Sequence, residues 1–185
     1  MSEPVQRTFL AYVEDCPGVL NRVSSLFRRR GFNIESFTVG QSDRPGVSRM
    51  TFVVKADEHG ARRIEATLYK LIQVISVKEI TDDPSVVCTL ALIKVKCTAS
   101  TRLELLCLSE ELGARQVDVT PASMILEFTT SPQTIPSLLA ALRPFGILEM
   151  VQTGAVAMQR GGGQAQTHEF ETQTEPQPLA TAIAA

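Results

Sequence analysis

The chain has 185 residues, of which 44% are hydrophobic, and its formal net charge at pH 7 is −2. This length can form one ordinary domain or two small ones with compact cores. Its small charge gives no strong field to attract nucleic acid or an anionic membrane, and no window holds the roughly 18 apolar residues that a spanning helix requires.

The beginning of the chain shows neither a cleavable signal pattern nor an Arg- and Ser-rich transit segment. Four cysteines lie far apart without a CxxC pair, which predicts neither a zinc site nor a disulfide framework; they are Cys16, Cys88, Cys97 and Cys107. We therefore expect a protein of a reducing compartment, the cytoplasm.

The first half of the chain alternates strand and helix patterns. A strand is predicted over 7–14, closed by Asp15, Pro17 and Gly18. A helix follows with one apolar stripe and a stop at Gly31; the stripe is Val19, Leu20, Val23, Leu26 and Phe27. Two strands follow at 32–40 and 47–55, then a helix capped by Asp57 and a last strand at 74–80. The residues of this helix that face inward are Ala61, Ile64, Leu68 and Leu71. Together these elements complete a βαββαβ unit.

The strand over 47–55 predicts two faces by its alternation. Met50, Phe52 and Val54 share one face, and Arg49, Thr51 and Val53 share the other. Between this strand and the one before it, Gln41 to Gly46 reads as a hairpin connection.

After Asp82, Asp83 and Pro84 a similar series begins. The predicted strands are 86–96, 115–120, 123–129 and 147–157, and the predicted helices are 101–112 and 134–142. The first of these helices has a mixed stripe of Leu103, Leu106, Cys107 and Glu110, with Gly113 as its stop. The fold class is thus α+β, with two consecutive ferredoxin-like βαββαβ units. The predicted domains are 1–82 and 83–160, followed by a disordered tail over 161–185 that is rich in Gly, Gln, Thr and Pro.

The turn from Asp15 to Gly18 is the first candidate site. Pro17 can set the entry to the helix, and Gly18 removes the side chain that would block the N–H groups of the first turn. Such a helix end attracts a carboxylate. A plain chain turn is the alternative interpretation.

Asn33 opens the next strand, where its amide can offer a donor and an acceptor to a zwitterion, while Asp15 can accept from an ammonium group. We expect both to face one small ligand. Gly40 can leave room for a branched aliphatic side chain. Local turn roles for Asn33 and Gly40 remain alternatives.

Motifs of catalysis are missing from the sequence. His59 and His168 accompany no nucleophile motif, and there is no GxGxxG, P-loop or HExxH. Asp82 and Asp83 are interpreted as a solvated linker rather than a metal site. The run from Arg28 to Arg30 is interpreted as a solvated last turn of a helix. We expect no catalytic residue and no metal ligand in this chain.

At these residues the chain resembles the regulatory (small) subunits of acetolactate synthase, also called acetohydroxyacid synthase, whose N-terminal part is an ACT domain. The resemblance runs from about residue 7 to residue 160 and is carried by PGVLNRV, RRGFNIESFTVG, SRMTFVV, LYKLIQVISV and LALIKVK. The phrase RPFGILEMVQTGAVAMQR is most similar to the cyanobacterial and plant branch.

The resemblance implies a non-catalytic regulatory subunit that binds and activates a catalytic (large) subunit and makes it sensitive to feedback inhibition by valine, with leucine and isoleucine as further effectors. It implies no cofactor on this chain, with thiamine diphosphate, Mg and FAD on the catalytic subunit. It also implies a homodimer through the ACT domain, a cytoplasmic location (plastid stroma in a photosynthetic eukaryote), and contact of the second unit with the catalytic subunit.

The effector positions that the resemblance implies lie at the interface of two ACT domains; they are Asp15, Gly18, Val19, Leu20, Asn33, Ile34 and Gly40. Asp15 stands where Asn is common in bacterial members. A stand-alone amino-acid-sensing protein that regulates another enzyme, and a small enzyme on the same scaffold, are the alternatives.

Overall fold

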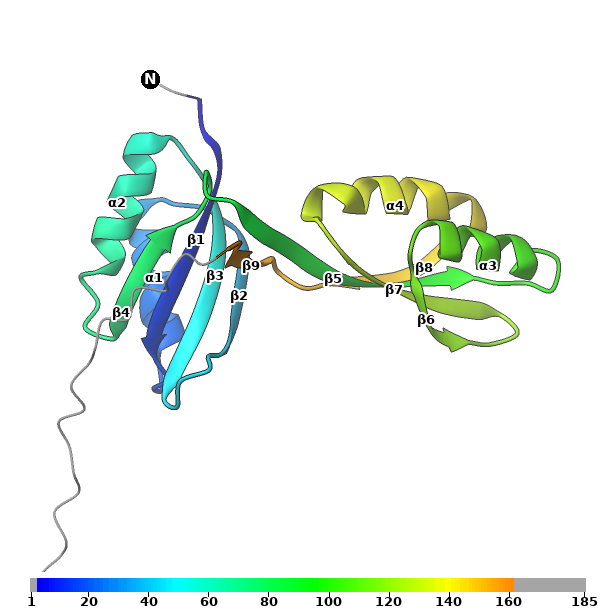
Figure 1. The fold of residues 1–185 in the computed structure, drawn as a ribbon, viewed down its shortest axis with the longest axis horizontal. Helices are drawn as coiled ribbons and strands as arrows, with labels where there is room; N and C mark the ends of the chain where they lie inside the picture. Colours follow the sequence, from blue (N-terminus) through cyan, green and yellow to red (C-terminus); the bar gives the residue numbers. More distant parts are fainter. Residues whose placement is uncertain (1–2, 162–185) are drawn as a thin grey trace, which may run out of the picture.

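A computed structural model describes residues 3–161 (Figure 1). Its first unit forms a four-stranded sheet in the order β2-β3-β1-β4. The elements are β1 (Val5–Glu14), α1 (Val19–Arg30), β2 (Ile34–Gln41), β3 (Val47–Ala56), α2 (Glu58–Leu68) and β4 (Val74–Glu79). The predicted ferredoxin-like unit is confirmed.

The helices of the first unit begin and end where local chemistry predicts. Gly31 ends α1 in the left-handed conformation at φ 71°, which favours a residue without a side chain. Asp57 caps α2, because its carboxylate accepts from the N–H of Gly60 at 2.7 Å. Both helices pack on one face of the sheet, where Phe9, Phe27 and Phe52 form the aromatic centre of the core.

The second unit repeats this arrangement, with the sheet order β6-β7-β5-β8. Its elements are β5 (Ser85–Lys96), α3 (Arg102–Glu111), β6 (Arg115–Val119), β7 (Ser123–Thr130), η1 (Pro132–Thr134), α4 (Ile135–Leu142), η2 (Arg143–Phe145), β8 (Ile147–Gln152) and β9 (Val156–Gln159). The second ferredoxin-like unit is therefore confirmed. The predicted tail over 161–185 lies outside the described residues, except for Gly161.

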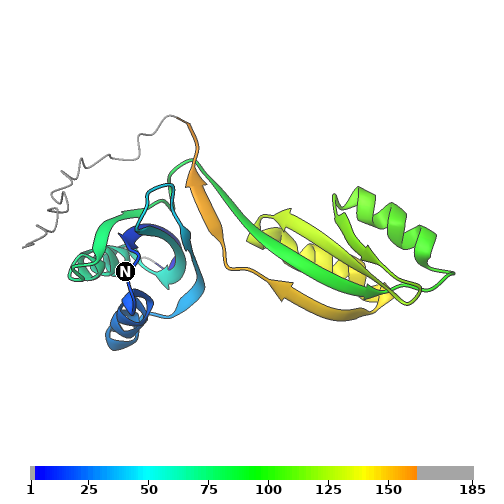
Figure 2. The same cartoon turned by 90° about the horizontal axis from the view of Figure 1, so that it is seen from below.

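One predicted strand, 147–157, is wrong as a single element. The structure has β8 and β9 instead, separated by Thr153, Gly154 and Ala155. β8 pairs with the second half of β5, and β9 pairs with its first half. Figure 2 shows β5 running from one unit to the other with β9 beside it. The break allows the chain to follow β5 past the point where the two sheets meet.

The predicted stripe of α3 is wrong except at Leu106, which packs against the core of the second unit. Leu103 is 74% exposed, whereas Leu105 and Ser109 are buried. Leu108 and Leu112 complete a stripe with this buried pair at positions i, i+3, i+4 and i+7. Both leucines pack against the core of the second unit. Residues 102–108 contain four leucines, so several faces of this helix are equally apolar and the sequence alone does not show which one is buried.

The face of the first sheet that lies away from its helices is covered as well. The predicted alternation in β3 is confirmed for the core face, yet Thr51 and Val53 on the other face are 2% and 9% exposed. A small cluster of Leu10, Ile80, Ala157 and Val87 joins this face to β5 and β9. We call it the inter-unit cluster.

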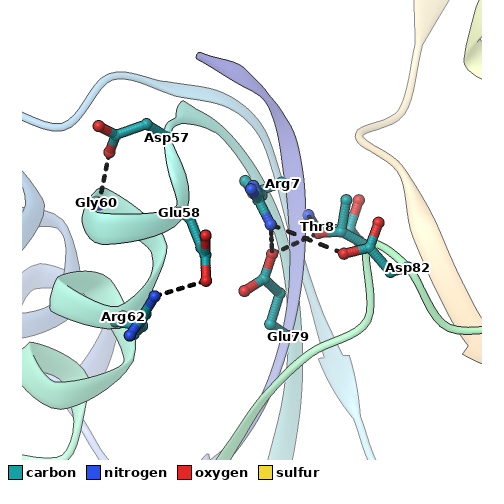
Figure 3. A network of polar contacts seen from close by, with 9 residues as sticks. Arg7, Thr8, Asp57, Glu58, Gly60, Arg62, Glu79 and Asp82 are labelled. Carbon is teal, nitrogen blue, oxygen red and sulfur yellow. Dashed lines mark hydrogen bonds and ion pairs between the residues drawn. The ribbon is translucent and has the colours of Figure 1, made fainter. Parts of the chain in front are cut away.

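Charged groups hold the end of the first unit together (Figure 3). Arg7 on β1 donates to Glu79 on β4 at 2.8 Å, and its Nη1 lies 3.9 Å from Asp82 in the connecting segment. The hydrogen bond to Glu79 raises the pKa of Arg7, so this side chain stays charged at all physiological pH values. Thr8 adds a backbone N–H bond to the hydroxyl of Thr81.

Candidate amino-acid-binding site

A hollow of about 410 Å³ lies at the start of α1. It is lined by Asp15, Cys16, Pro17, Gly18, Val19, Leu20, Val39 and Ser48. The structure thus brings together four of the predicted site residues: Asp15, Gly18, Val19 and Leu20.

The first turn of α1 borders this hollow, and the N–H of Val19 at its start donates to the carbonyl of Cys16 at 3.3 Å. Gly18 stands at the N-cap with φ 85°, a conformation that residues with side chains rarely adopt, and no side chain caps the helix. The first turn also contains no acidic residue. The N–H groups of a first turn have no partner within their own helix, so this end can accept an anion.

The walls of the hollow are mainly apolar. Val19 is buried, while Leu20 is 43% exposed and can contact a bound molecule. Val39 contributes from β2 and packs against the first core. Ser48, a buried polar residue at the start of β3, adds a hydroxyl. A small molecule with a carboxylate and an aliphatic side chain suits this lining.

Val39 and Ser48 were missing from the predicted site, whereas Cys16 and Pro17 belong to the turn that the sequence singled out. Ser48 carried a signal in the sequence, because it shares the inward parity of Met50, Phe52 and Val54 and is polar at an otherwise apolar set of positions. Val39 carried no such signal, since an inward valine in a strand is ordinary core.

Asn33 and Ile34 lie at the other end of α1, away from the hollow of their own chain. Ile34 pairs with Val54, whereas Gly40, near the hollow, pairs with Arg49. The 12 residues of α1 rise about 1.5 Å each, which places Asn33 roughly 18 Å along the helix from Gly18. Asn33 and Asp15 of one chain therefore do not face one ligand together.

Gly40 does not line the hollow either. It follows Val39, whose side chain points to the core, so position 40 faces the opposite side of the sheet. No atom lies within 4 Å of a Cβ built on Gly40, so a side chain at this position would meet no neighbour. The missing side chain of Gly40 therefore does not enlarge the hollow.

The other residues that the sequence singled out lie outside the hollow. His59 is exposed at the start of α2, and Arg28, Arg29 and Arg30 are exposed in the last turn of α1, both as predicted; His168 lies outside the described residues. Within residues 3–161, no group of three or more His, Cys, Asp or Glu side chains is placed to hold a metal ion. Over the same residues no helix is long and apolar enough to cross a membrane.

Both units match known families. Residues 9–76 match a family model described as the AHAS small subunit-like ACT domain, and residues 89–161 match one described as the small subunit of acetolactate synthase. The acetolactate synthase small subunit of Mycolicibacterium smegmatis is 45% identical over 154 residues, which cover 83% of this chain and 91% of that protein. The probable acetolactate synthase small subunit of Methanothermobacter thermautotrophicus is 41% identical over 160 residues, covering 86% and 95%.

A solved structure agrees with the sequence relatives. The crystal structure of the acetolactate synthase small subunit from Thermotoga maritima superposes with a TM-score of 0.79 at 34% identity. The match covers 85% of this chain and 98% of the other. The likeness therefore spans both units and their connection.

Proposed function

Because the chain belongs to the family of acetolactate synthase small subunits, the regulatory partners of a catalytic large subunit, we propose that it activates that subunit and makes it sensitive to feedback inhibition by valine. The pathway concerned is the biosynthesis of valine, leucine and isoleucine. The observation that carries the proposal is the hollow at the start of α1, where uncapped N–H groups meet apolar walls.

Each group of a free branched-chain amino acid has a counterpart in this hollow. The N–H groups of the first turn of α1 suit the carboxylate. Leu20 and Val39 suit an aliphatic side chain, and Asp15 suits the ammonium group. The largely apolar walls disfavour a highly charged ligand and favour valine and its close relatives.

Asn33 joins the site in a homodimer. β2 is an edge strand of its sheet, so its outward backbone groups are available to a second copy. If β2 pairs antiparallel with β2 of a second copy about a two-fold axis, the start of one β2 lies beside the end of the other. Asn33 and Ile34 of one chain then reach the partner's hollow, near Val39. The 18 Å separation within one chain thus supports a site shared between two chains.

The mechanism is a shift between two arrangements of the dimer. Valine inhibits if it binds more tightly to an arrangement that couples poorly to the catalytic subunit, since a ligand moves an equilibrium only by its difference in affinity. The second unit, residues 83–160, contacts the catalytic subunit in this proposal. Thiamine diphosphate, Mg and FAD are held by the catalytic subunit and supply the chemistry there.

The proposed location is the cytoplasm. The curated relatives named above come from a bacterium and an archaeon, and they give no support to a plastid.

Calorimetric titration of valine into the purified chain tests the site. We expect Asn33→Ala to weaken binding about tenfold or more, because an amide that orients a zwitterion contributes on the order of 1.5 kcal/mol or more through hydrogen bonds to charged groups. The control is His59→Ala, an exposed polar residue of the same unit. Circular dichroism checks that both variants fold; an unchanged dissociation constant in folded Asn33→Ala would remove Asn33 from the site.

Reconstitution tests the activity. The purified chain alone should convert no pyruvate, and adding it to the catalytic subunit should raise acetolactate formation, which valine then lowers. Turnover of pyruvate by this chain alone would contradict the regulatory role. Failure to bind the catalytic subunit, with valine still bound, would favour a sensor for another enzyme.

A further inference from the structure

The segment Thr153–Ala155 connects the two units and lies against β2 of the first unit. Thr153 belongs to the second unit by its hydrogen bonds, since its N–H donates to the carbonyl of Leu90 at 2.9 Å. Its carbonyl accepts from the hydroxyl of Thr89 at 2.8 Å, and its own hydroxyl accepts from the N–H of Leu90 at 3.1 Å. Thr89 is 1% exposed, so this attachment to β5 is buried on the side of Thr89, whereas Thr153 is exposed.

Gly154 then lies directly on β2 of the first unit. A Cβ at this position would come 2.8 Å from the carbonyl oxygen of Phe37 and 3.0 Å from the hydroxyl of Ser36, and it would also overlap the hydroxyl of Thr38. Cβ atoms essentially never approach a backbone oxygen this closely. Gly154 has no positive φ, so the need for glycine here is one of space.

Further contacts fix the chain after Gly154 to the same face of the first sheet. The N–H of Ala155 donates to the hydroxyl of Ser36 at 2.7 Å. The guanidinium of Arg49 donates to the carbonyl of Ala157, and Ala157 is buried in the inter-unit cluster. We call the segment Thr153–Ala155, with these contacts, the clamp.

The clamp is a local contact rather than part of a continuous interface. A hollow of about 500 Å³ opens at this contact, and its lining includes Val53, Val87 and the contacting residues Ser36, Phe37, Thr153, Gly154 and Ala155. β2 therefore contacts the connecting segment directly at Gly154 and Ala155.

β2 also carries residues of the proposed valine site. Asn33 immediately precedes the strand and Val39 lines the hollow at its other end, while the clamp contacts the residues between them, Ser36, Phe37 and Thr38. Because no room for even a methyl group remains between Gly154 and these residues, a shift of β2 toward the segment would displace it.

We infer that the clamp holds the two units in one relative arrangement and transmits the ligand state of the first unit to the second. The first half of this inference stands on the contacts alone. The second half rests on the proposed valine site. Gly154 is a positioning residue: it contacts no ligand, and its role is to let the segment lie on β2.

The test uses Gly154→Ala in the full chain. The first measurement is the distance between two spin labels in the absence of ligand. One label is attached to the exposed native Cys107 of α3 and the other to Lys70→Cys, just after α2. Cys16→Ser and Cys88→Ser remove the other partly exposed thiols. Each labelled chain is mixed with an excess of unlabelled chain so that a dimer carries one labelled copy. We expect one narrow distance in the parent and a broadened or shifted distribution in Gly154→Ala.

The control is Met158→Ala, which removes a side chain that is 66% exposed on β9 and should leave the distribution unchanged. Ser36→Ala removes the bond to Ala155 without adding an atom, and we expect a smaller broadening. It keeps the test decisive if Gly154→Ala fails to fold. An unchanged distribution in Gly154→Ala, or in Ser36→Ala where Gly154→Ala fails to fold, would overturn the clamp.

The second measurement uses the unlabelled chain with its native cysteines. Valine should slow hydrogen exchange in β8 of the parent, and this effect should be lost in Gly154→Ala although calorimetry still shows valine binding. Equal slowing in both proteins would overturn the transmission. If the parent binds no valine at all, the proposed site fails, and the ligand-free distances still decide whether the clamp exists.

Discussion

The pair Arg115–Glu127 shows how a single residue on this fold responds to pH. Arg115 on β6 donates from Nε to one carboxylate oxygen of Glu127 on β7 at 3.0 Å and from Nη2 to the other. These hydrogen bonds stabilise the carboxylate and hold the pKa of Glu127 below its ordinary value of 4.5. A carboxyl group with a lowered folded pKa stabilises the fold above its ordinary pKa, and this contribution is lost as the pH falls through the lowered pKa.

We therefore predict that Arg115→Ala raises the pKa of Glu127 toward 4.5. The measurement is an NMR titration of the Glu127 carboxyl carbon in the parent and in the variant. Added salt should also raise the pKa in the parent, because an exposed pair is screened by ions. Identical titration curves in parent and variant would show that the pair does not form in solution.

At the scale of elements, α3 shows that composition alone does not select the buried face of a leucine-rich helix. Leu103 and Leu105 are chemically identical and two positions apart, yet one is 74% exposed and the other is fully buried. The difference arises because positions two apart point to different sides of a helix. The sheet beneath, through Ile93, Leu126 and Phe128, determines which side is covered.

Leu105→Ala should lower the free energy of unfolding by about 2–5 kcal/mol, since it leaves a cavity in the second core. Leu103→Ala is the matched control and should change it by less than about 0.5 kcal/mol. Urea denaturation of both variants, followed by circular dichroism, measures the two values. A larger loss for Leu103→Ala would mean that the helix is rotated from the position described, or that Leu103 is buried in an assembly.

At the scale of the whole molecule, the proposed site needs two chains, and this makes it testable by mixing. Leu20→Asp places a carboxylate in the first turn of α1, where the helix tolerates it and where it competes with a bound carboxylate for the same N–H groups. Asn33→Ala removes the contribution from the partner. Each variant alone should bind valine poorly.

A mixture of the two variants should regain binding at one site per mixed dimer. One hollow of that dimer combines a parent Leu20 with a parent Asn33, whereas the other combines both substitutions. Calorimetry of co-refolded, separately tagged chains measures the number of sites. If the mixture binds no better than the separate variants, Asn33 and the hollow do not meet across the dimer.

Much of the fold follows from residues that are neighbours in sequence. The stripe of α1, the stop at Gly31, the cap at Asp57 and the alternation of β3 each depend on a few consecutive residues, so their periodicity alone predicts the elements and both βαββαβ units. The same holds for one part of the site: the turn from Asp15 to Leu20 is a single local structure, and its residues line one hollow.

The sequence by itself thus determined both βαββαβ units and the loop that forms the candidate site, but not the break between β8 and β9. Only the tertiary structure decided that α3 buries Leu105 rather than Leu103, that the outer face of β3 is buried, and that Gly154 must lack a side chain. Ser36 and Ala155 are 119 positions apart and meet through a hydrogen bond. No local pattern encodes such a contact, because it depends on how two separately formed units pack against each other.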